Sequence, residues 1–292
     1  MHKQSTIRVL VVDDYQPWQD SICSTIATIQ GLQVVDTASD GREAVVKAEE
    51  VQPNLILLDI GLPGLNGIEA AQQIRQVAPE SRILFVSENR SADIIDAAIA
   101  TGAVGYIVKS NASTELSPAL QSIRCCLALN NSASAETGQE LVYEEIVDIA
   151  VSLMRSDYAS MQKLFPERGA GGELRLLAFR GFNPHAARFW EWVRADSKST
   201  CGIALRDVRR VVAEDIATCD SMADSEDQEV YLQTGIRACQ TTPLIARSGT
   251  VVGMISTHWR TPHQPSADDF RLFDILARGA AGVIEECGRE ES

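Results

Sequence analysis

The 292-residue sequence predicts two domains: an α/β domain with a five-stranded, doubly wound parallel sheet, followed by an α+β domain with an antiparallel sheet and flanking helices. Three observations predict this architecture. Short β-branched runs alternate with segments of helical period from residue 7 to about residue 128. A small, polar stretch without apolar period follows at 129–137. After this stretch, strand-like runs dominate and helical segments are few.

Five apolar runs in the first half are each followed by a segment of helical period. The expected strands are 7–12 (IRVLVV), 32–38 (LQVVDTA), 54–58 (NLILL), 82–87 (RILFVS) and 105–109 (GYIVK). The expected helices are 17–29, 41–50, 67–78, 91–102 and 113–129. Alternating strands and helices with short connections indicate a parallel sheet that is covered on both faces by right-handed crossovers.

The second half follows a different pattern. Strand-like runs occur at 173–181, 209–216, 236–247 and 250–259, and helical segments bracket them. The first bracketing helix is expected after a capping box of Thr137 with Glu140, and the last after a capping box of Ser266 with Asp269. The boundaries that follow are a first domain at 5–128, a linker at 129–137, a second domain at 138–288 and a tail at 289–292.

Composition narrows the classes of function. The formal net charge is −14 and no basic run occurs, which argues against DNA as a partner because nucleic-acid binding depends on clustered Lys and Arg. The seven cysteines are scattered and lack C-x-x-C spacing, so reduced thiols are expected. No apolar stretch reaches the length of a membrane span, and the protein is expected to be cytoplasmic with no membrane partner.

Reactive side chains stand at the ends of four predicted parallel strands. Asp13 and Asp14 follow the first strand, Asp59 follows the third, and Ser87 and Lys109 end the fourth and fifth. The carboxyl ends of these strands meet at one edge of the sheet. Three converging carboxylates repel one another unless a cation is present, and their oxygen atoms suit Mg²⁺. The pattern predicts a magnesium site at which Asp59 acts as a nucleophile on a phosphoryl group.

Each of these residues also has an ordinary structural explanation. Asp13 and Asp14 could cap the next helix, Ser87 could belong to a turn, and Lys109 could be a solvated strand end. Their joint occurrence at four strand ends favours the functional interpretation. In that interpretation, Ser87 and Lys109 stabilise the oxygen atoms of the phosphoryl group.

These strand-end residues resemble, over residues 7–128, the receiver domain of bacterial two-component response regulators, which has a flavodoxin-like fold. The resemblance implies that Asp59 accepts a phosphoryl group from a histidine kinase or a phosphotransfer protein. It also implies that Mg²⁺ binds Asp14 and Asp59 directly, the backbone carbonyl of Gly61, and Asp13 through water.

The same resemblance implies roles for four further positions. Ser87 and Lys109 occupy the positions that stabilise the phosphoryl group, and Tyr106 occupies the aromatic switch position. The Lys-Ser-Asn-Ala run at 109–112 resembles the LuxR/NarL-like subgroup, yet no DNA-binding helix pair follows it. Glu88 stands where the family usually has a small residue, so it is expected to modulate access to the site, unless it points outward as an ordinary loop residue.

The second half resembles a GAF domain over residues 138–288. Such domains bind a small molecule on a cupped sheet or dimerise through flanking helices. A bilin needs a reactive cysteine that is usually followed by histidine, whereas Cys201 is followed by Gly202 and is expected to be a packing residue. His258 could ligate a metal or haem but has no partner motif. Neither bilin nor haem is therefore expected, and the GAF ligand is unknown.

The densest aromatic cluster of the sequence also falls in this half. Phe182, Phe189, Trp190 and Trp192 lie close together in the sequence. They could line a ligand cup, but a core role is favoured because aromatic side chains supply much of the area of any core.

The sequence thus predicts a response regulator of a two-component phosphorelay, with a GAF domain for sensing or dimerisation. A homodimer and output to an unknown downstream protein are expected, with no enzymatic activity beyond self-catalysed phosphoryl transfer to Asp59. One alternative is an aspartyl-phosphate phosphatase or phosphotransferase. The haloacid-dehalogenase type of such enzymes carries a D-x-D pair, however, and Asp13 and Asp14 are adjacent. The other alternative is a scaffold that works without phosphorylation.

Overall fold

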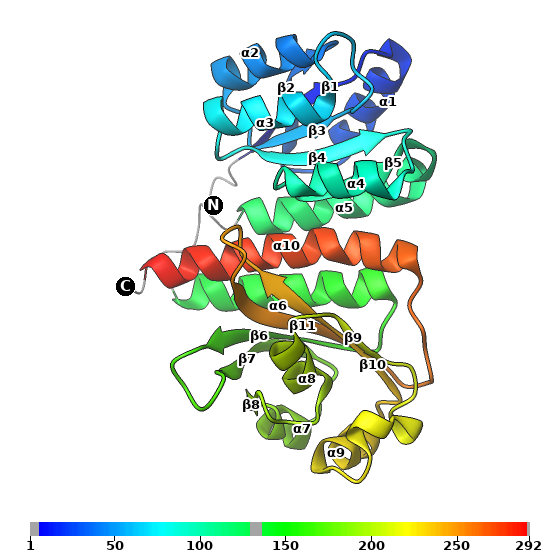
Figure 1. The fold of residues 1–292 in the computed structure, drawn as a ribbon, viewed down its shortest axis with the longest axis vertical. Coiled ribbons are helices and arrows are strands. Elements are labelled where there is room, and N and C mark those ends of the chain that lie inside the picture. Colours follow the sequence, from blue (N-terminus) through cyan, green and yellow to red (C-terminus); the bar gives the residue numbers. More distant parts are fainter. Residues whose placement is uncertain (1–5, 129–135, 291–292) are drawn as a thin grey trace. The chain divides into compact units, whose positions relative to one another are not determined.

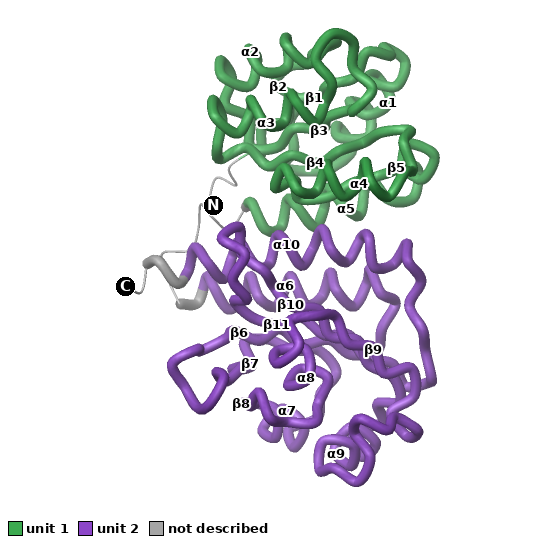
Figure 2. The backbone as a smooth tube through the Cα atoms, viewed as in Figure 1, with its two compact units in different colours: residues 1–131 green, residues 132–292 purple. Residues whose placement is uncertain are grey.

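The computed structural model describes residues 6–128 and 136–290 of a chain that divides into two compact units, 1–131 and 132–292 (Figures 1 and 2). Each unit contains its own sheet. Among the described helices, none combines the length and the apolar character that a membrane span requires.

The first unit is the predicted doubly wound α/β fold. Its five strands are parallel and lie in the order β2-β1-β3-β4-β5. The strands are β1 (Ile7–Val12), β2 (Leu32–Ala38), β3 (Leu55–Leu58), β4 (Arg82–Ser87) and β5 (Gly105–Val108). The helices are α1 (Gln16–Ala27), α2 (Gly41–Val51), α3 (Gly67–Val77), α4 (Ala92–Ala100) and α5 (Ala112–Ala128), with a 3-10 turn η1 (Lys109–Asn111) before α5.

Helices cover both faces of this sheet (Figure 1), which explains why its central strands are apolar throughout. Alternate strand residues such as Leu10, Ile56 and Phe85 pack in one core cluster with buried alanines of α2, α3 and α4. All four residues of β3 are buried. The residues that follow the carboxyl ends of the strands are not enclosed between the sheet and the helices. Their side chains can therefore line a site at this edge of the sheet.

The second unit has a six-stranded antiparallel sheet in the order β8-β7-β6-β11-β10-β9. The strands are β6 (Tyr158–Phe165), β7 (Glu173–Arg180), β8 (Trp192–Arg194), β9 (Val211–Ala213), β10 (Ala238–Ile245) and β11 (Val251–Trp259). The helices are α6 (Glu136–Met154), α7 (Pro184–Phe189), α8 (Thr200–Asp207), α9 (Glu226–Thr234) and α10 (Ala267–Glu290), with 3-10 turns η2 (Ile216–Thr218) and η3 (Asp220–Met222). The predicted α+β class is confirmed.

Helices α6 and α10 bracket the sheet in sequence, contact each other, and both pack on it (Figure 1). The predicted capping box at the last helix is present, because Asp269 N–H donates to Ser266 Oγ at 3.1 Å and Ser266 N–H donates to Asp269 Oδ2 at 2.9 Å. The predicted capping box of Thr137 with Glu140 depends on the Thr137 side chain, which lies outside the described residues, and α6 is described from Glu136. Strands β6 and β8 were not predicted.

Candidate functional site

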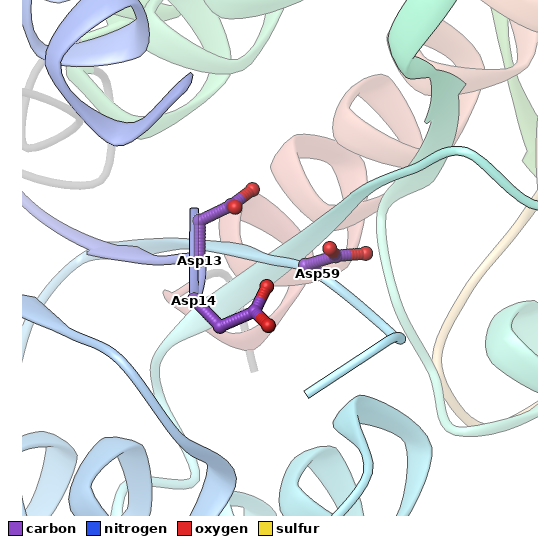
Figure 3. A group of neighbouring side chains, drawn as sticks. All are labelled: Asp13, Asp14 and Asp59. Atoms are coloured by element: carbon purple, nitrogen blue, oxygen red, sulfur yellow. The ribbon is translucent and has the colours of Figure 1, made fainter. Parts of the chain in front are cut away.

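The carboxyl ends of β1 and β3 bring three carboxylates together, as predicted (Figure 3). One oxygen each of Asp13, Asp14 and Asp59 lies within 4.8 Å of the others. Asp13 and Asp59 are buried, whereas Asp14 is exposed. Among the described residues, this is the one group of three or more potential metal-ligating side chains. Two buried like charges at this spacing are unfavourable without a nearby cation.

The Asp59 carboxylate is held by its own loop and by Lys109. Asp59 Oδ1 accepts hydrogen bonds from the backbone N–H of Ile60 at 2.6 Å and of Gly61 at 3.2 Å. Asp59 Oδ2 accepts from Lys109 Nζ at 2.7 Å. The backbone bonds fix the rotation of the carboxylate, and one oxygen faces the ammonium group.

Lys109 contributes the positive charge of this cluster. Its Nζ lies 2.7 Å from Asp13 Oδ2 and 2.7 Å from Asp59 Oδ2. Burial lowers the pKa of Lys109, but the hydrogen bonds to Asp13 and Asp59 outweigh burial and hold this pKa above its ordinary value. Burial likewise raises the pKa of Asp13, against the opposing effect of Lys109. Lys109 is therefore an ammonium group at neutral pH, and it bridges two strand ends.

A cavity of about 880 Å³ opens beside the acidic cluster. Its lining includes six residues that the sequence singled out: Asp14, Asp59, Gly61, Ser87, Glu88 and Lys109. Ser87 is buried and Glu88 is exposed. This volume accommodates a phosphoryl group, a hydrated cation and part of a donor molecule.

Tyr106 lies behind the cavity wall. Its side chain is only 3% exposed, and its hydroxyl donates to the backbone carbonyl of Asn89 at 2.7 Å. Burial raises the pKa of Tyr106, and a hydrogen bond with Ser87 partly offsets this effect. The predicted switch residue thus contacts both the hydroxyl of the site and the loop that follows β4.

The sequence interpretation missed Trp18 and Arg90, which also line the cavity. The Trp18 ring centroid lies 5.7 Å from Lys109 Nζ, so an aromatic face borders the ammonium group. Arg90 donates to Ser110 Oγ at 2.7 Å and links the two loops after β4 and β5. Trp18 lies four residues after the acidic pair, in the first turn of the next helix. This position could have indicated from the sequence that its side chain lies near the site.

The residues fit a magnesium ion. Asp14 and Asp59 offer oxygen ligands, Asp13 lies beside them, and Gly61 lines the same cavity. Three carboxylates face a single ammonium group here, so negative charge exceeds positive charge and a divalent cation would restore the balance. When bound, Mg²⁺ would polarise an incoming phosphoryl group.

The interior of the second unit contains polar side chains bonded to one another. Thr241 Oγ1 lies 2.8 Å from both Thr200 Oγ1 and Ser256 Oγ, and Cys201 Sγ lies 3.3 Å from Ser256 Oγ. Burial raises the pKa of Cys201. Cys201 is thus a buried thiol with hydroxyl partners, as expected for a packing residue.

His258 lies in the same interior and is only 2% exposed. Neither of its ring nitrogens has a hydrogen-bond partner among the described residues. Its ring centroid lies 5.4 Å from that of Phe182 and 5.9 Å from that of Tyr231. Burial alone lowers its pKa to about 3. His258 is therefore a neutral ring in an aromatic environment.

Three of the four aromatic residues that lie close together in the sequence also contact one another in the structure, and Trp192 does not belong to this group. Phe182 and Phe189 both contact Trp190, at centroid distances of 5.3 and 5.7 Å. Trp192 instead packs on Phe165 at 5.4 Å, and the Arg168 guanidinium lies 3.9 Å from its centroid. Trp190 belongs to the core of the second unit, and the partly buried Phe182 and Phe189 pack against that core, which supports the core interpretation.

Comparison with known proteins follows this division of the chain. Residues 9–121 match the family "Response regulator receiver domain", and residues 136–285 match the family "GAF domain". The chain is a receiver domain joined to a GAF domain. The recognised families agree with the two sheets and with the strand-end site.

Relatives of the receiver domain are response regulators. Response regulator GacA of Pseudomonas protegens is 33% identical over 138 residues, which are 47% of this chain and 63% of that relative. The chain thus spans less than two thirds of GacA. Response regulator protein VraR of Staphylococcus aureus is 31% identical over 61% of this chain and 78% of its own length. A solved response regulator of the LuxR family from Aurantimonas sp. is 34% identical, covering 41% of this chain and 86% of that one, with a TM-score of 0.39.

Proposed function

We propose that this chain is a two-component response regulator that accepts a phosphoryl group on Asp59 from a histidine kinase or a phosphotransfer protein. The observation that carries the proposal is the Asp59 carboxylate itself, which lies within 4.8 Å of two further carboxylates and 2.7 Å from Lys109 Nζ. The relatives of the receiver domain support a signalling role.

The chain's own residues account for the transfer step. A carboxylate oxygen of Asp59 forms a bond to phosphorus while the P–N bond of phosphohistidine breaks, and the electron pair leaves with the imidazole nitrogen. Lys109 and Ser87 border the cavity where the phosphoryl oxygens would lie, and they can donate hydrogen bonds to them. Mg²⁺ on Asp14, Asp59 and the Gly61 carbonyl, with Asp13 through water, would neutralise the charge of the donor.

Asp59→Asn should abolish phosphorylation of the full chain by acetyl phosphate in the presence of Mg²⁺. The amide lacks the anionic oxygen that attacks phosphorus, so intact-mass spectrometry should show one added phosphoryl group in the wild type and none in the variant. Asp96→Asn, the same change at an exposed carboxylate on α4, is the matched control and should retain labelling. Equal labelling of Asp59→Asn and the wild type would show that Asp59 is not the phosphoacceptor. An unlabelled wild type would favour the scaffold alternative.

We further propose that the GAF domain senses a ligand or mediates homodimerisation, and that output passes to a downstream protein. The formal net charge of −14 supports a protein partner over DNA. Tyr106 supports coupling to the site, because it contacts the loop after β4 through Asn89. Its present inward position is one of the two states that such a switch requires.

Glu88→Ala should accelerate both phosphorylation by acetyl phosphate and hydrolytic loss of the phosphoryl group. Glu88 is an exposed acid that lines the cavity. If its side chain points into the entry, it would repel an anionic donor and narrow the access. We expect roughly a fivefold increase, the effect of one close charge pair in water. Glu88→Gln should recover only the charge component. Rates within twofold of the wild type in both variants would show that the side chain points away from the entry.

A further inference from the structure

Gly41, the first residue of α2, lies directly against the loop that follows Asp59. A Cβ atom at this position would stand 2.0 Å from the backbone oxygen of Leu65 and 2.9 Å from its carbonyl carbon. Both are backbone atoms, which cannot rotate away as the end of a side chain can. Close approach therefore restricts this position to glycine.

Helix α2 is not free to move away from the loop. The Asp40 side chain fixes the first turn of α2, and with it the position of Gly41 in the helix, by accepting from the backbone N–H of Arg42 and Glu43 at 2.8 and 2.9 Å. Ala44 and Ala48 of α2 are fully buried in the core of the first unit. The opposing loop is exposed at Pro63, Gly64 and Asn66. A side chain at position 41 would thus displace the exposed part of the loop around Leu65, between the buried Leu62 and Gly67, more readily than the helix.

A displacement of the backbone at Leu65 would be transmitted to the backbone of Asp59 through the contacts of Gly67. The backbone N–H of Gly67 donates to the carbonyl of Ile60 at 3.0 Å. A Cβ at Gly67 would stand 2.0 Å from the backbone oxygen of Asp59, so the end of the loop lies against its beginning. The segment between these points carries Gly61, whose carbonyl is the expected metal ligand.

We infer that Gly41 is a positioning residue of the phosphoacceptor loop, through which α2 supports the metal-binding geometry without contacting the site. This inference rests on the proposed function in so far as Mg²⁺ is taken to bind at Asp59. Metal ligands are held in position by residues that do not themselves bind the metal. Mutation of such residues typically lowers the affinity for the metal 10- to 100-fold.

Gly41→Ala in the full chain should raise the Mg²⁺ dissociation constant roughly tenfold. Mg²⁺ binding can be followed by the fluorescence of Trp18, whose ring lies 5.7 Å from Lys109 Nζ, and a Trp18→Phe variant identifies its part of the signal. The matched control is Gly64→Asn on the same loop, where a Cβ would meet no atom within 4 Å and asparagine tolerates the φ of +73°. It should bind Mg²⁺ within twofold of the wild type.

Two further readouts separate positioning from general destabilisation. At saturating Mg²⁺, the phosphorylation rate of Gly41→Ala should approach the wild-type rate, because the defect is in metal binding. Without metal, amide hydrogen exchange should accelerate in loop 60–66 but not in α2. Unchanged Mg²⁺ affinity in folded Gly41→Ala, or equal weakening in Gly64→Asn, would overturn the inference.

A double variant covers the case in which Gly41→Ala does not fold. Leu65→Gly removes the Leu65 Cβ, which would lie 3.0 Å from a Cβ at position 41, and lets the loop backbone adjust. The double variant should bind Mg²⁺ more weakly than Leu65→Gly alone, and equal affinity would refute the inference. If Mg²⁺ affinities differ as expected while even the wild type accepts no phosphoryl group, the inference stands and the proposed function fails.

Discussion

Chelation of Mg²⁺ with EDTA should abolish phosphorylation of the full chain by acetyl phosphate, with a fall in rate of roughly 100-fold or more. The reason is the charge of the site. Three carboxylates within 4.8 Å of one another face one ammonium group, so an anionic donor is repelled until a divalent cation binds.

The rate can be measured as the intact-mass increase over time, with EDTA and after excess Mg²⁺ is restored. Restored Mg²⁺ should recover the full rate, whereas Ca²⁺ should recover less because it prefers longer bonds and more ligands than this site offers. Asp14→Asn should require more Mg²⁺ for half-maximal rate, since it removes one of the three carboxylates. An undiminished rate in EDTA would show that Lys109 alone supplies the charge that the donor needs.

Acidification should destabilise the GAF domain through His258. The folded-state pKa of His258 is about 3, against an ordinary value of 6.5, because burial disfavours the imidazolium. The unfolded state therefore binds the proton more readily. The stabilising contribution is fully present above pH 6.5 and is lost as the pH falls from there toward 3. Between about pH 7 and about pH 5 the loss should be about 2 kcal/mol in the free energy of unfolding.

Urea denaturation followed by tryptophan fluorescence measures this loss. Trp190 reports on the same core, because Phe182 contacts both its ring and that of His258. The matched variant is His258→Phe, which keeps a ring between Phe182 and Tyr231 but cannot take up a proton. It should lack this part of the acid destabilisation while carboxylates still titrate. Equal losses in both proteins, or an imidazolium His258 in NMR spectra of the folded protein at about pH 5, would contradict the prediction.

Sequence patterns were sufficient for the α/β half. Strand β3 is buried at all four positions, so its apolar run could hardly be read as anything other than a central parallel strand. The strand order β2-β1-β3-β4-β5 is the one that the flavodoxin-like resemblance implies. The chemistry at the strand ends follows in turn, because parallel strands direct their carboxyl ends to one edge.

In the second half, sequence patterns did not predict every strand or every side-chain contact. The first five residues of β6 are all buried, the polar Ser160 and Gln162 included, so the polar positions of this strand do not mark a solvent-exposed face. Its identity as a strand depends on pairing with β11 on one side and β7 on the other. Trp192 was grouped with Trp190 from proximity in sequence, but Trp190 follows α7 and Trp192 begins β8, so the two rings point to different neighbours.

By itself, the sequence determined the class of both folds and the residue types of the site, because both depend on local period and on which residues follow each strand. Tertiary structure alone decided which of those residues touch. The two ion pairs of Lys109, the ring contacts of His258 with Phe182 and Tyr231, and the approach of Gly41 to Leu65 are contacts between distant segments. Such contacts depend on ångström-scale distances that close packing imposes, and no local pattern of side chains specifies those distances.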